Sequence, residues 1–447
     1  MATGRTPSFP KPPTDPLELP PTSSKTHQDN SFHLCTEGRH ACRSSVQPTH
    51  PKNGTNGTNG ISICNFCSIR SEAVIPEPNF PVKPDEFVGR RPQVEAFRQA
   101  LRQGMATGRT PSFAVLGEWG IGKSSLLSKC SAVCEEPEFD MLPVPFSVSN
   151  ELGDYRRFAE LLVNTFGGCL ARAQSIQARV REEAQNWKLK SVNVGPVALQ
   201  RQTPKLFLTS GTAILRHAVQ DAWRRFIQPA QLNGIVFFLD DLHNLATPSQ
   251  DAIALALRDQ FQSFGIENIN CSICFSAPAN YFSNIRSLAE PAVRFYDKVY
   301  LGPFSLPETI EYVEAIFEKA TNRAEFAQWL HSKTGGHPYF MAFICRQYAQ
   351  LTYGDDKLDA TEHWHEILHR LEKEKFSADL AQVTEREVHL LRALARCKEQ
   401  EINRKEFADY ARIYFTRLTD KGLLTRTGRG HYRLYHPLFR EFLRQTK

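Results

Sequence analysis

The sequence has no long uninterrupted run of apolar residues. No stretch approaches the roughly 18 to 20 apolar residues that span a bilayer, and the N-terminus lacks the apolar core of a signal peptide. The eleven cysteines form no even framework, and several lie in apolar runs, such as Cys271, Cys274 and Cys345. These features exclude a membrane-spanning chain and a disulfide-stapled secreted domain. We expect reduced thiols and a cytoplasmic location.

A large excess of charge is also absent. The formal net charge of +6 is small for 447 residues, and it neither requires nor excludes nucleic acid as a partner. Hydrophobic residues make up 41% of the chain, which is enough for a substantial core. At roughly 150 residues per domain, this length predicts two or three domains.

Residues 1–84 lack apolar periodicity and are rich in Pro, Ser, Thr, Asn and His. Such a segment buries too little apolar surface to offset its conformational entropy, so we predict a disordered leader. Cys64 and Cys67 in it have the spacing of half a zinc site, but the other half is irregular, and incidental cysteines are the alternative. The opening nonapeptide MATGRTPSF recurs at 105–113. This repeat favours a duplicated, dispensable extension.

From residue 85 the composition becomes that of a globular protein. Five short apolar runs alternate with segments whose apolar residues have the spacing of a helix. The runs predict buried parallel strands at 113–116, 141–148, 234–239, 270–275 and 298–301. This alternation predicts an α/β fold, with a doubly wound parallel sheet over residues 85–305. Residues 306–383 are predicted to form a helical lid. Residues 384–447 read as three helices, two short strands across Thr427 to Gly430 and a last helix, the order of a winged helix.

One segment has the pattern of a phosphate-binding loop (P-loop). Residues 117–124 read GEWGIGKS and fit GxxxxGK[ST] at every position, between a predicted strand and a predicted helix. The glycines let backbone N–H groups point at phosphates, and the helix presents its positive end to them. Lys123 is expected to reach the β- and γ-phosphates of ATP, and the Ser124 hydroxyl to ligate Mg²⁺. The predicted nucleotide-contacting residues here are Gly117, Glu118, Trp119, Gly120, Ile121, Gly122, Lys123, Ser124 and Ser125.

Two acidic residues, Asp240 and Asp241, end the apolar run GIVFFL. A carboxylate at the tip of a buried parallel strand lies beside the P-loop in such a sheet. Asp240 is the expected Mg²⁺ ligand, through water, and Asp241 the expected base that polarises the attacking water. An ordinary strand-to-helix cap is the alternative interpretation. Since Asp reaches one methylene less far than Glu, slow hydrolysis of ATP is favoured.

These motifs together resemble the AAA+ and STAND branch of the P-loop ATPases, specifically the group of origin-recognition initiators and archaeal-type STAND ATPases. The segment FVGR at 87–90, with Glu95 after it, is similar to the box that opens those domains. The resemblance implies that Val88 and Arg90 border the adenine. It also implies that Ser276 is a catalytic sensor of the γ-phosphate, because relatives carry a polar residue there.

Two further assignments follow from this resemblance. The segment TGGHP at 334–338 resembles the glycine-x-proline signature of STAND lids, which implies that His337 and Pro338 approach the nucleotide. Arg294 lies where relatives place an arginine finger that acts on a neighbouring subunit. Arg286 competes for that role, and a surface arginine is the alternative for either.

The C-terminal segment leaves two functions open. Residues 384–447 hold 15 Lys and Arg against 8 Asp and Glu, a surplus of seven. Several fall on the predicted third helix or beside the predicted wing, the arrangement of a DNA-binding winged helix: Arg412, Arg417, Lys421, Arg426, Arg429 and Arg433. In STAND proteins the resembling module packs on the ATPase core and locks the nucleotide.

We therefore expect a regulatory ATPase switch, which acts on a protein partner or through self-assembly. A DNA-bound ATPase akin to an initiator or loader is the alternative. A nucleotide-binding scaffold without hydrolysis is a third interpretation.

Overall fold

The computed structural model describes residues 75–149, 152, 155–173, 211–245, 250–284, 290–351 and 357–445. The described residues belong to one compact unit, Ile69–Lys447. Residues 1–74 of the predicted leader, with its cysteine pair and the first nonapeptide copy, lie outside the described residues, as does Arg286. None of the described helices is long and apolar enough to cross a membrane.

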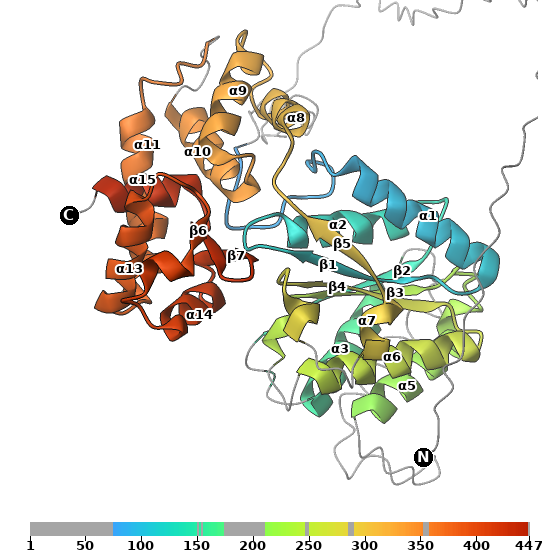
Figure 1. Cartoon of the computed structure of the whole chain (residues 1–447). Coiled ribbons are helices and arrows are strands. Elements are labelled where there is room, and N and C mark those ends of the chain that lie inside the picture. Colours follow the sequence, from blue (N-terminus) through green and yellow to red (C-terminus); the bar gives the residue numbers. More distant parts are fainter. Residues whose placement is uncertain are drawn as a thin grey trace, which may run out of the picture. The chain divides into compact units, whose positions relative to one another are not determined.

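Five parallel strands form the central sheet, in the order β2-β3-β4-β1-β5 (Figure 1). In chain order they are β1 (Ser112–Gly117), β2 (Leu142–Ser147), β3 (Ile235–Asp240), β4 (Cys271–Ala277) and β5 (Tyr296–Leu301). Each predicted apolar run is a strand, so the predicted α/β fold is confirmed. Because β4 lies between β1 and β3, their C-terminal ends meet at one edge, and the candidate site lies there.

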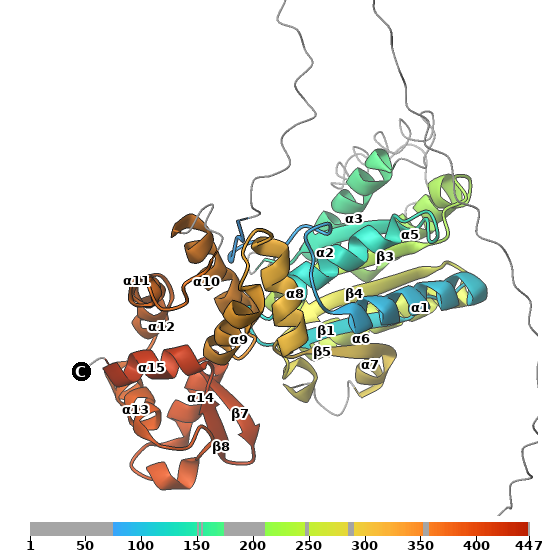
Figure 2. The same ribbon diagram turned by 90° about the horizontal axis from the view of Figure 1, so that it is seen from above.

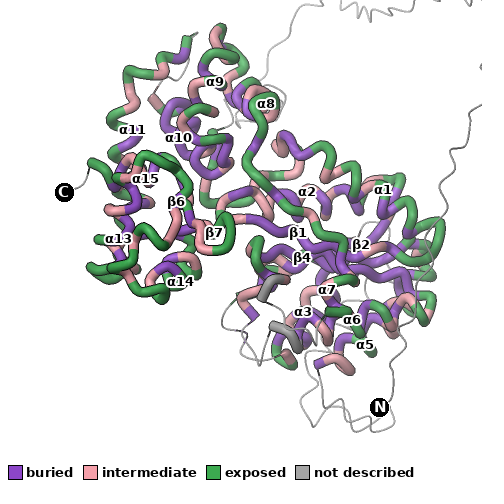
Figure 3. Tube along the Cα trace, viewed as in Figure 1, coloured by how far each residue is buried: buried purple, intermediate pink, exposed green. Residues whose placement is uncertain are grey.

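Helices cover both faces of this sheet (Figure 1). One face packs against α1 (Arg91–Thr107) and α2 (Lys123–Cys134), and the other against α3 (Tyr155–Arg172), α5 (Gly211–Ala222) and α6 (Gln250–Ile266). In β1, Phe113 and Val115 pack on the first face and Ala114 and Leu116 on the second. Because the side chains alternate in this way, helices cover both faces of the strand, and every residue of β1 is buried (Figure 3).

Short elements continue or connect these helices. A π-helical turn, Trp223–Ile227, extends α5, and 3₁₀ turns cover Leu242–Asn244 and Tyr281–Asn284. Helix α7 (Glu290–Phe295) leads directly into β5.

The rest of the chain is helical up to a small antiparallel sheet. The predicted lid consists of α8 (Leu306–Ile316), α9 (Arg323–Thr334), α10 (Pro338–Leu351), α11 (Trp364–Leu371), a π-helical turn (Glu372–Phe376) and α12 (Ser377–Ala381). The C-terminal segment holds α13 (Glu385–Arg396), β6 (Ile402–Asn403), a 3₁₀ turn (Arg404–Phe407), α14 (Arg412–Asp420), β7 (Leu424–Gly428), β8 (His431–Leu434) and α15 (Pro437–Gln445).

The predicted hairpin is present as β7 and β8, which we call the C-terminal hairpin, and β6 pairs with β8. The prediction of a second helix in this segment is wrong, because only a 3₁₀ turn forms between α13 and α14. Helices of the lid and of the C-terminal segment share one hydrophobic cluster, which reaches from Phe304 to Leu443. Helices α9 and α15 lie side by side in it (Figure 2). The winged-helix interpretation of this segment stays a prediction.

Candidate nucleotide-binding site

The P-loop joins the end of β1 to the start of α2, as the sequence predicts. Gly120 and Gly122 have φ angles of 71° and 94°, a backbone conformation that favours glycine. A Cβ atom on Gly120 would lie 2.8 Å from the Cβ of Tyr339, so a side chain has no room there. The first N–H groups of α2 have no partner within the helix, and such groups stabilise an anion. The loop is therefore shaped for phosphate.

Lys123 is the first residue of α2. Its ammonium donates hydrogen bonds to the carbonyl oxygens of Gly117 at 3.3 Å and Glu118 at 2.9 Å. Burial lowers the pKa of Lys123, while the nearby carboxylates of Asp241, Asp240 and Glu118 act to raise it. The ammonium and the two predicted acids thus lie close enough for their charges to interact, as the sequence predicts.

Ser276 connects the two acids at the end of the sheet. Its hydroxyl donates to Oδ1 of Asp240 at 2.5 Å and accepts the backbone N–H of Asp241 at 2.8 Å. Asp241 has a left-handed backbone with φ of 55°, so the chain turns sharply directly after β3. Burial and the Asp240 charge raise the pKa of Asp241. The structure thus brings the predicted acids and the predicted sensor residue together.

His243 is a neighbour of this cluster that sequence reasoning missed. Its Nδ1 lies 3.9 Å from Oδ1 of Asp241. Burial lowers the pKa of His243, so the imidazole is neutral at neutral pH. The sequence could have indicated His243, because it lies only three residues after Asp240.

The segment at 334–338 lies against the P-loop, and the approach of His337 and Pro338 to a nucleotide stays a prediction. The N–H of Tyr339 donates to the carbonyl oxygen of Gly120 at 3.1 Å. The ring of Tyr339 lies 4.5 Å from the ring of Trp119, between centroids. The His337 ring would contact a Cβ on Gly120 at 3.1 Å. The start of α10 therefore lies directly on the loop, and His337 and Tyr339, on either side of Pro338, make the contact.

The C-terminal hairpin also reaches the P-loop, and sequence reasoning missed this contact. The Thr425 hydroxyl on β7 donates to Oε1 of Glu118 at 3.1 Å, and the guanidinium of Arg433 on β8 lies 3.9 Å from the same oxygen. The ammonium of Lys375 lies 4.3 Å from the ring centroid of Trp119, a cation–π contact. The lid and the hairpin therefore contact three consecutive residues of the P-loop. The hairpin contacts Glu118, and the lid contacts Trp119 and Gly120.

Lys421 is the C-cap residue of α14, at the end of the predicted third helix, and its side chain is turned to a buried acid. Helix α14 ends at Asp420, and Gly422 follows with φ of 73°, a left-handed conformation that ends helices. The Lys421 ammonium lies 2.8 Å from the carboxylate of Glu387, whose side chain is fully buried. A buried carboxylate requires such a partner, so Lys421 is paired within this segment. Arg433 pairs with Glu118 of the P-loop.

His436 ties the hairpin region to the lid. Its ring stacks on Phe340 at 3.6 Å, and Nε2 lies 2.9 Å from the carbonyl oxygen of Thr334. The N–H of Leu438 donates to Nδ1 at 3.1 Å. Burial lowers the pKa of His436 to about 3, so the ring is neutral. One tautomer, with the proton on Nε2, satisfies both bonds. Sequence reasoning missed this residue too.

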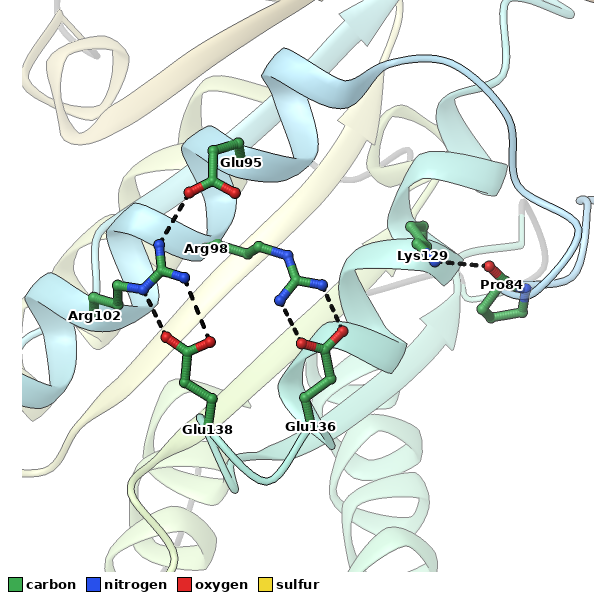
Figure 4. Close-up of polar contacts among 7 residues, drawn as sticks. All are labelled: Pro84, Glu95, Arg98, Arg102, Lys129, Glu136 and Glu138. Carbon is green, nitrogen blue, oxygen red and sulfur yellow. Dashed lines mark hydrogen bonds and ion pairs between the residues drawn. The ribbon is translucent and has the colours of Figure 1, made fainter. Parts of the chain in front are cut away.

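The opening box lies in two environments. Arg90 is buried and donates hydrogen bonds to the carbonyl oxygens of Ile121 and Gly302, and Val88 is half-buried. Glu95 lies at the surface, where it pairs with Arg102 (Figure 4). Helix α1 is held to the turn after α2 by further ion pairs, Arg98–Glu136 and Arg102–Glu138 (Figure 4).

Residues 75–90, which precede α1, contact both the core and the lid. The N–H of Val82 donates to the Ser125 hydroxyl at 3.2 Å, and the Lys129 ammonium donates to the carbonyl oxygen of Pro84 at 2.9 Å (Figure 4). The carboxylate of Glu77 pairs with Arg346 on α10. Ser125 therefore faces this segment.

Arg294 lies on α7, outside the cluster of acids and P-loop. Its side chain is 77% exposed, and it pairs with Glu290 one turn earlier in the same helix. Its assignment as an arginine finger stays a prediction.

Comparisons with known proteins agree with this geometry. Residues 86–266 match the AAA ATPase domain family. The Walker-type ATPase PABY2304 of Pyrococcus abyssi is similar in structure, with 14% identity, a TM-score of 0.52, and coverage of 81% of this chain and 97% of that chain. The Aeropyrum pernix ORC2 protein, in its ADPNP–ADP complexes, has 15% identity, a TM-score of 0.51, and coverage of 82% and 96%.

At these identities the two structures show the fold alone. No curated protein matches the chain. The family match, the parallel sheet and the P-loop lead to the same conclusion. Residues 86–266 match an AAA ATPase domain, and the chain has the α/β fold and the P-loop of an ATPase.

Proposed function

We propose that this ATPase is a regulatory switch, in which the nucleotide at the P-loop controls the position of the lid and the C-terminal hairpin. The supporting observation is the set of contacts on Glu118, Trp119 and Gly120, which join the P-loop to α10 and to the hairpin. The P-loop can bind nucleotide with these contacts formed or with them broken. If nucleotide binds one of these two states more tightly, it shifts the equilibrium toward that state, which couples binding to conformation. The switch acts on a protein partner or through self-assembly.

The residues at the sheet edge fit an Mg²⁺ ion. The Ser124 hydroxyl and the Asp240 carboxylate would hold it, since Mg²⁺ prefers oxygen ligands. Burial and the Asp240 charge raise the pKa of Asp241, so the two carboxylates lie close enough for their charges to interact. When bound, the ion neutralises charge on the phosphate oxygens.

The other residues divide the work of hydrolysis. Lys123, whose ammonium is bonded to loop carbonyls, would turn to the β- and γ-phosphates of ATP. Asp241 would accept a hydrogen bond from the attacking water and orient it. Ser276 would hold both acids in place, and the short reach of Asp241 favours slow turnover.

We expect Ser276→Ala to lower kcat for ATP hydrolysis about 10- to 100-fold, because a hydrogen bond to a charged group contributes about 1.5–3 kcal/mol. The Kd for ATP should stay nearly constant, since Ser276 bonds to the acids and not to the P-loop. Phosphate release and calorimetric titration measure the two quantities. The control is Ser263→Ala, because the Ser263 hydroxyl donates to the Gln260 carbonyl of its own helix. Full kcat in Ser276→Ala would refute this role.

The switch depends on competition between ATP and the docked hairpin. ATP places negative charge beside Glu118, which holds Thr425 and attracts Arg433. Repulsion between the phosphates and this carboxylate would alter the loop on which the hairpin rests. By reciprocity, a hairpin that is held less firmly should permit tighter binding of ATP.

We therefore expect Thr425→Val to tighten ATP binding about 2- to 10-fold, the effect of one hydrogen bond of about 0.5–1.5 kcal/mol. Calorimetric titration with a non-hydrolysable ATP analogue measures it. Thr427→Val is the matched control, because Thr427 lies on the same strand and its hydroxyl bonds Glu401, away from the P-loop. Equal Kd values for Thr425→Val and the wild type would argue against the competition.

DNA binding is the second candidate function. Arg412 and Arg417 on α14 and Arg429 in the hairpin turn are exposed, and their side chains have no partner among the residues that the structure describes. They lie on the two elements that a winged helix uses for DNA. The seven-charge surplus of residues 384–447 also favours phosphate contacts.

A gel shift with duplex DNA at 50 to 200 mM salt tests this candidate. If these residues contact DNA, the double variant Arg412→Gln/Arg417→Gln should weaken binding and lower the salt slope by about two. Arg91→Gln, which removes an exposed arginine from α1, is the control. Absence of binding by the wild type at 50 mM salt would exclude DNA and leave the switch.

A further inference from the structure

A buried arginine links the P-loop to residues 302–305, the segment between β5 and α8, which we call the hinge. Arg90 is 6% exposed. Its Nη2 donates to the carbonyl oxygen of Ile121, within the P-loop, at 3.3 Å and to that of Gly302 at 2.5 Å. Gly302 follows β5 and precedes Ser305, the N-cap of α8. Both hydrogens of Nη2 are thus used, one on the loop and one on the hinge.

Two other contacts hold the same residue. The guanidinium lies 4.6 Å from the ring centroid of Phe304, in a cation–π contact. The backbone N–H of Arg90 donates to Oε1 of Glu308 at 2.9 Å. The other oxygen of Glu308 accepts the N–H of Ser305 at 2.8 Å and completes the capping box of α8. Arg90 therefore contacts the P-loop, the hinge and the first lid helix at once.

The physical consequence lies in the cost of a buried charge. Removal of a guanidinium from water is unfavourable unless carbonyl or carboxylate oxygens replace the lost hydrogen bonds. Here the direct acceptors are two carbonyl oxygens on different elements. Any movement of the hinge that draws Gly302 away from Ile121 leaves the cation short of a partner. The loop and the hinge are therefore expected to move together.

We propose that Arg90 is a positioning residue for nucleotide binding, which transmits the orientation of the lid to the P-loop. This role differs from an adenine contact, which the resemblance to known ATPases implied for Arg90, because the bonded face of the guanidinium is turned to backbone carbonyls. The inference rests on the proposed function of the P-loop as the nucleotide site. Arg90 acts through Ile121 and touches no reacting atom.

The neighbouring Arg91 supplies a matched control. Its side chain is 81% exposed and pairs with Glu311 on α8 at 2.8 Å. Arg91→Gln thus removes a contact between α1 and the lid but none with the P-loop. Arg90→Gln removes the contacts to both the loop and the hinge, and Arg90→Lys keeps the charge but not the planar fork.

The experiment measures the Kd of full-length variants for a non-hydrolysable ATP analogue below their melting temperatures. We expect Arg90→Gln to raise the Kd about tenfold, within the usual range of coupling energies. Arg90→Lys should recover part of the affinity, and Arg91→Gln should bind as the wild type. Val219→Ala, which truncates a fully buried side chain on α5, controls for loss of stability alone. An equal rise of Kd in Val219→Ala at equal loss of melting temperature would overturn the inference.

Hydrogen exchange of the nucleotide-free protein gives a second readout. In Arg90→Gln and in Arg90→Lys, amides at 120–124 and at 302–306 should both exchange faster than in Arg91→Gln. Faster exchange at only one of these segments would overturn the inference, as would a wild-type Kd in Arg90→Gln. Lys123→Ala separates this inference from the proposed function: if that variant binds the analogue as the wild type does, the P-loop assignment itself fails. If it loses binding while Arg90→Gln keeps it, only the role of Arg90 fails.

Discussion

The Gly120 carbonyl accepts the N–H of Tyr339 because a glycine with φ of 71° leaves no side chain between the P-loop and α10. That close approach determines much of the remaining structure. It places His337 and Tyr339 on the loop and leaves Trp119 beside Lys375. The lid therefore rests on the same short backbone segment that is shaped to hold phosphate. A bulkier residue at this position would separate the two.

Buried polar groups keep the elements around the loop in register. The Arg90 guanidinium is shared between the P-loop and the hinge, and the neutral His436 ring joins α15 to the end of α9. Lys421 neutralises the buried Glu387 within the C-terminal segment. A buried polar group left without its partner is costly, so each bond favours one arrangement of its elements. Such bonds permit discrete states, which suits a switch better than continuous flexibility.

The central sheet and the centre of the site could be predicted from the sequence because both depend on local patterns. The run GIVFFL predicts a doubly buried strand, and a P-loop needs only a glycine pattern between a strand and a helix. Parallel topology then brings Asp240 and Ser276 to one edge. The contact of Thr425 with Glu118 could not be predicted, because it joins residues 307 positions apart through the packing of separate elements. The pairing of Lys421 with Glu387 could not be predicted either, since Glu387 reads as an ordinary helix-start residue.

The most direct test of the account is hydrogen exchange at the C-terminal hairpin, residues 424–434, with and without a non-hydrolysable ATP analogue and Mg²⁺. If nucleotide at the P-loop controls the hairpin, exchange there should change on binding in the wild type and should not change in Lys123→Ala. If the wild type binds the analogue and the exchange of the hairpin stays the same, the proposed coupling between the P-loop and the C-terminal segment is wrong.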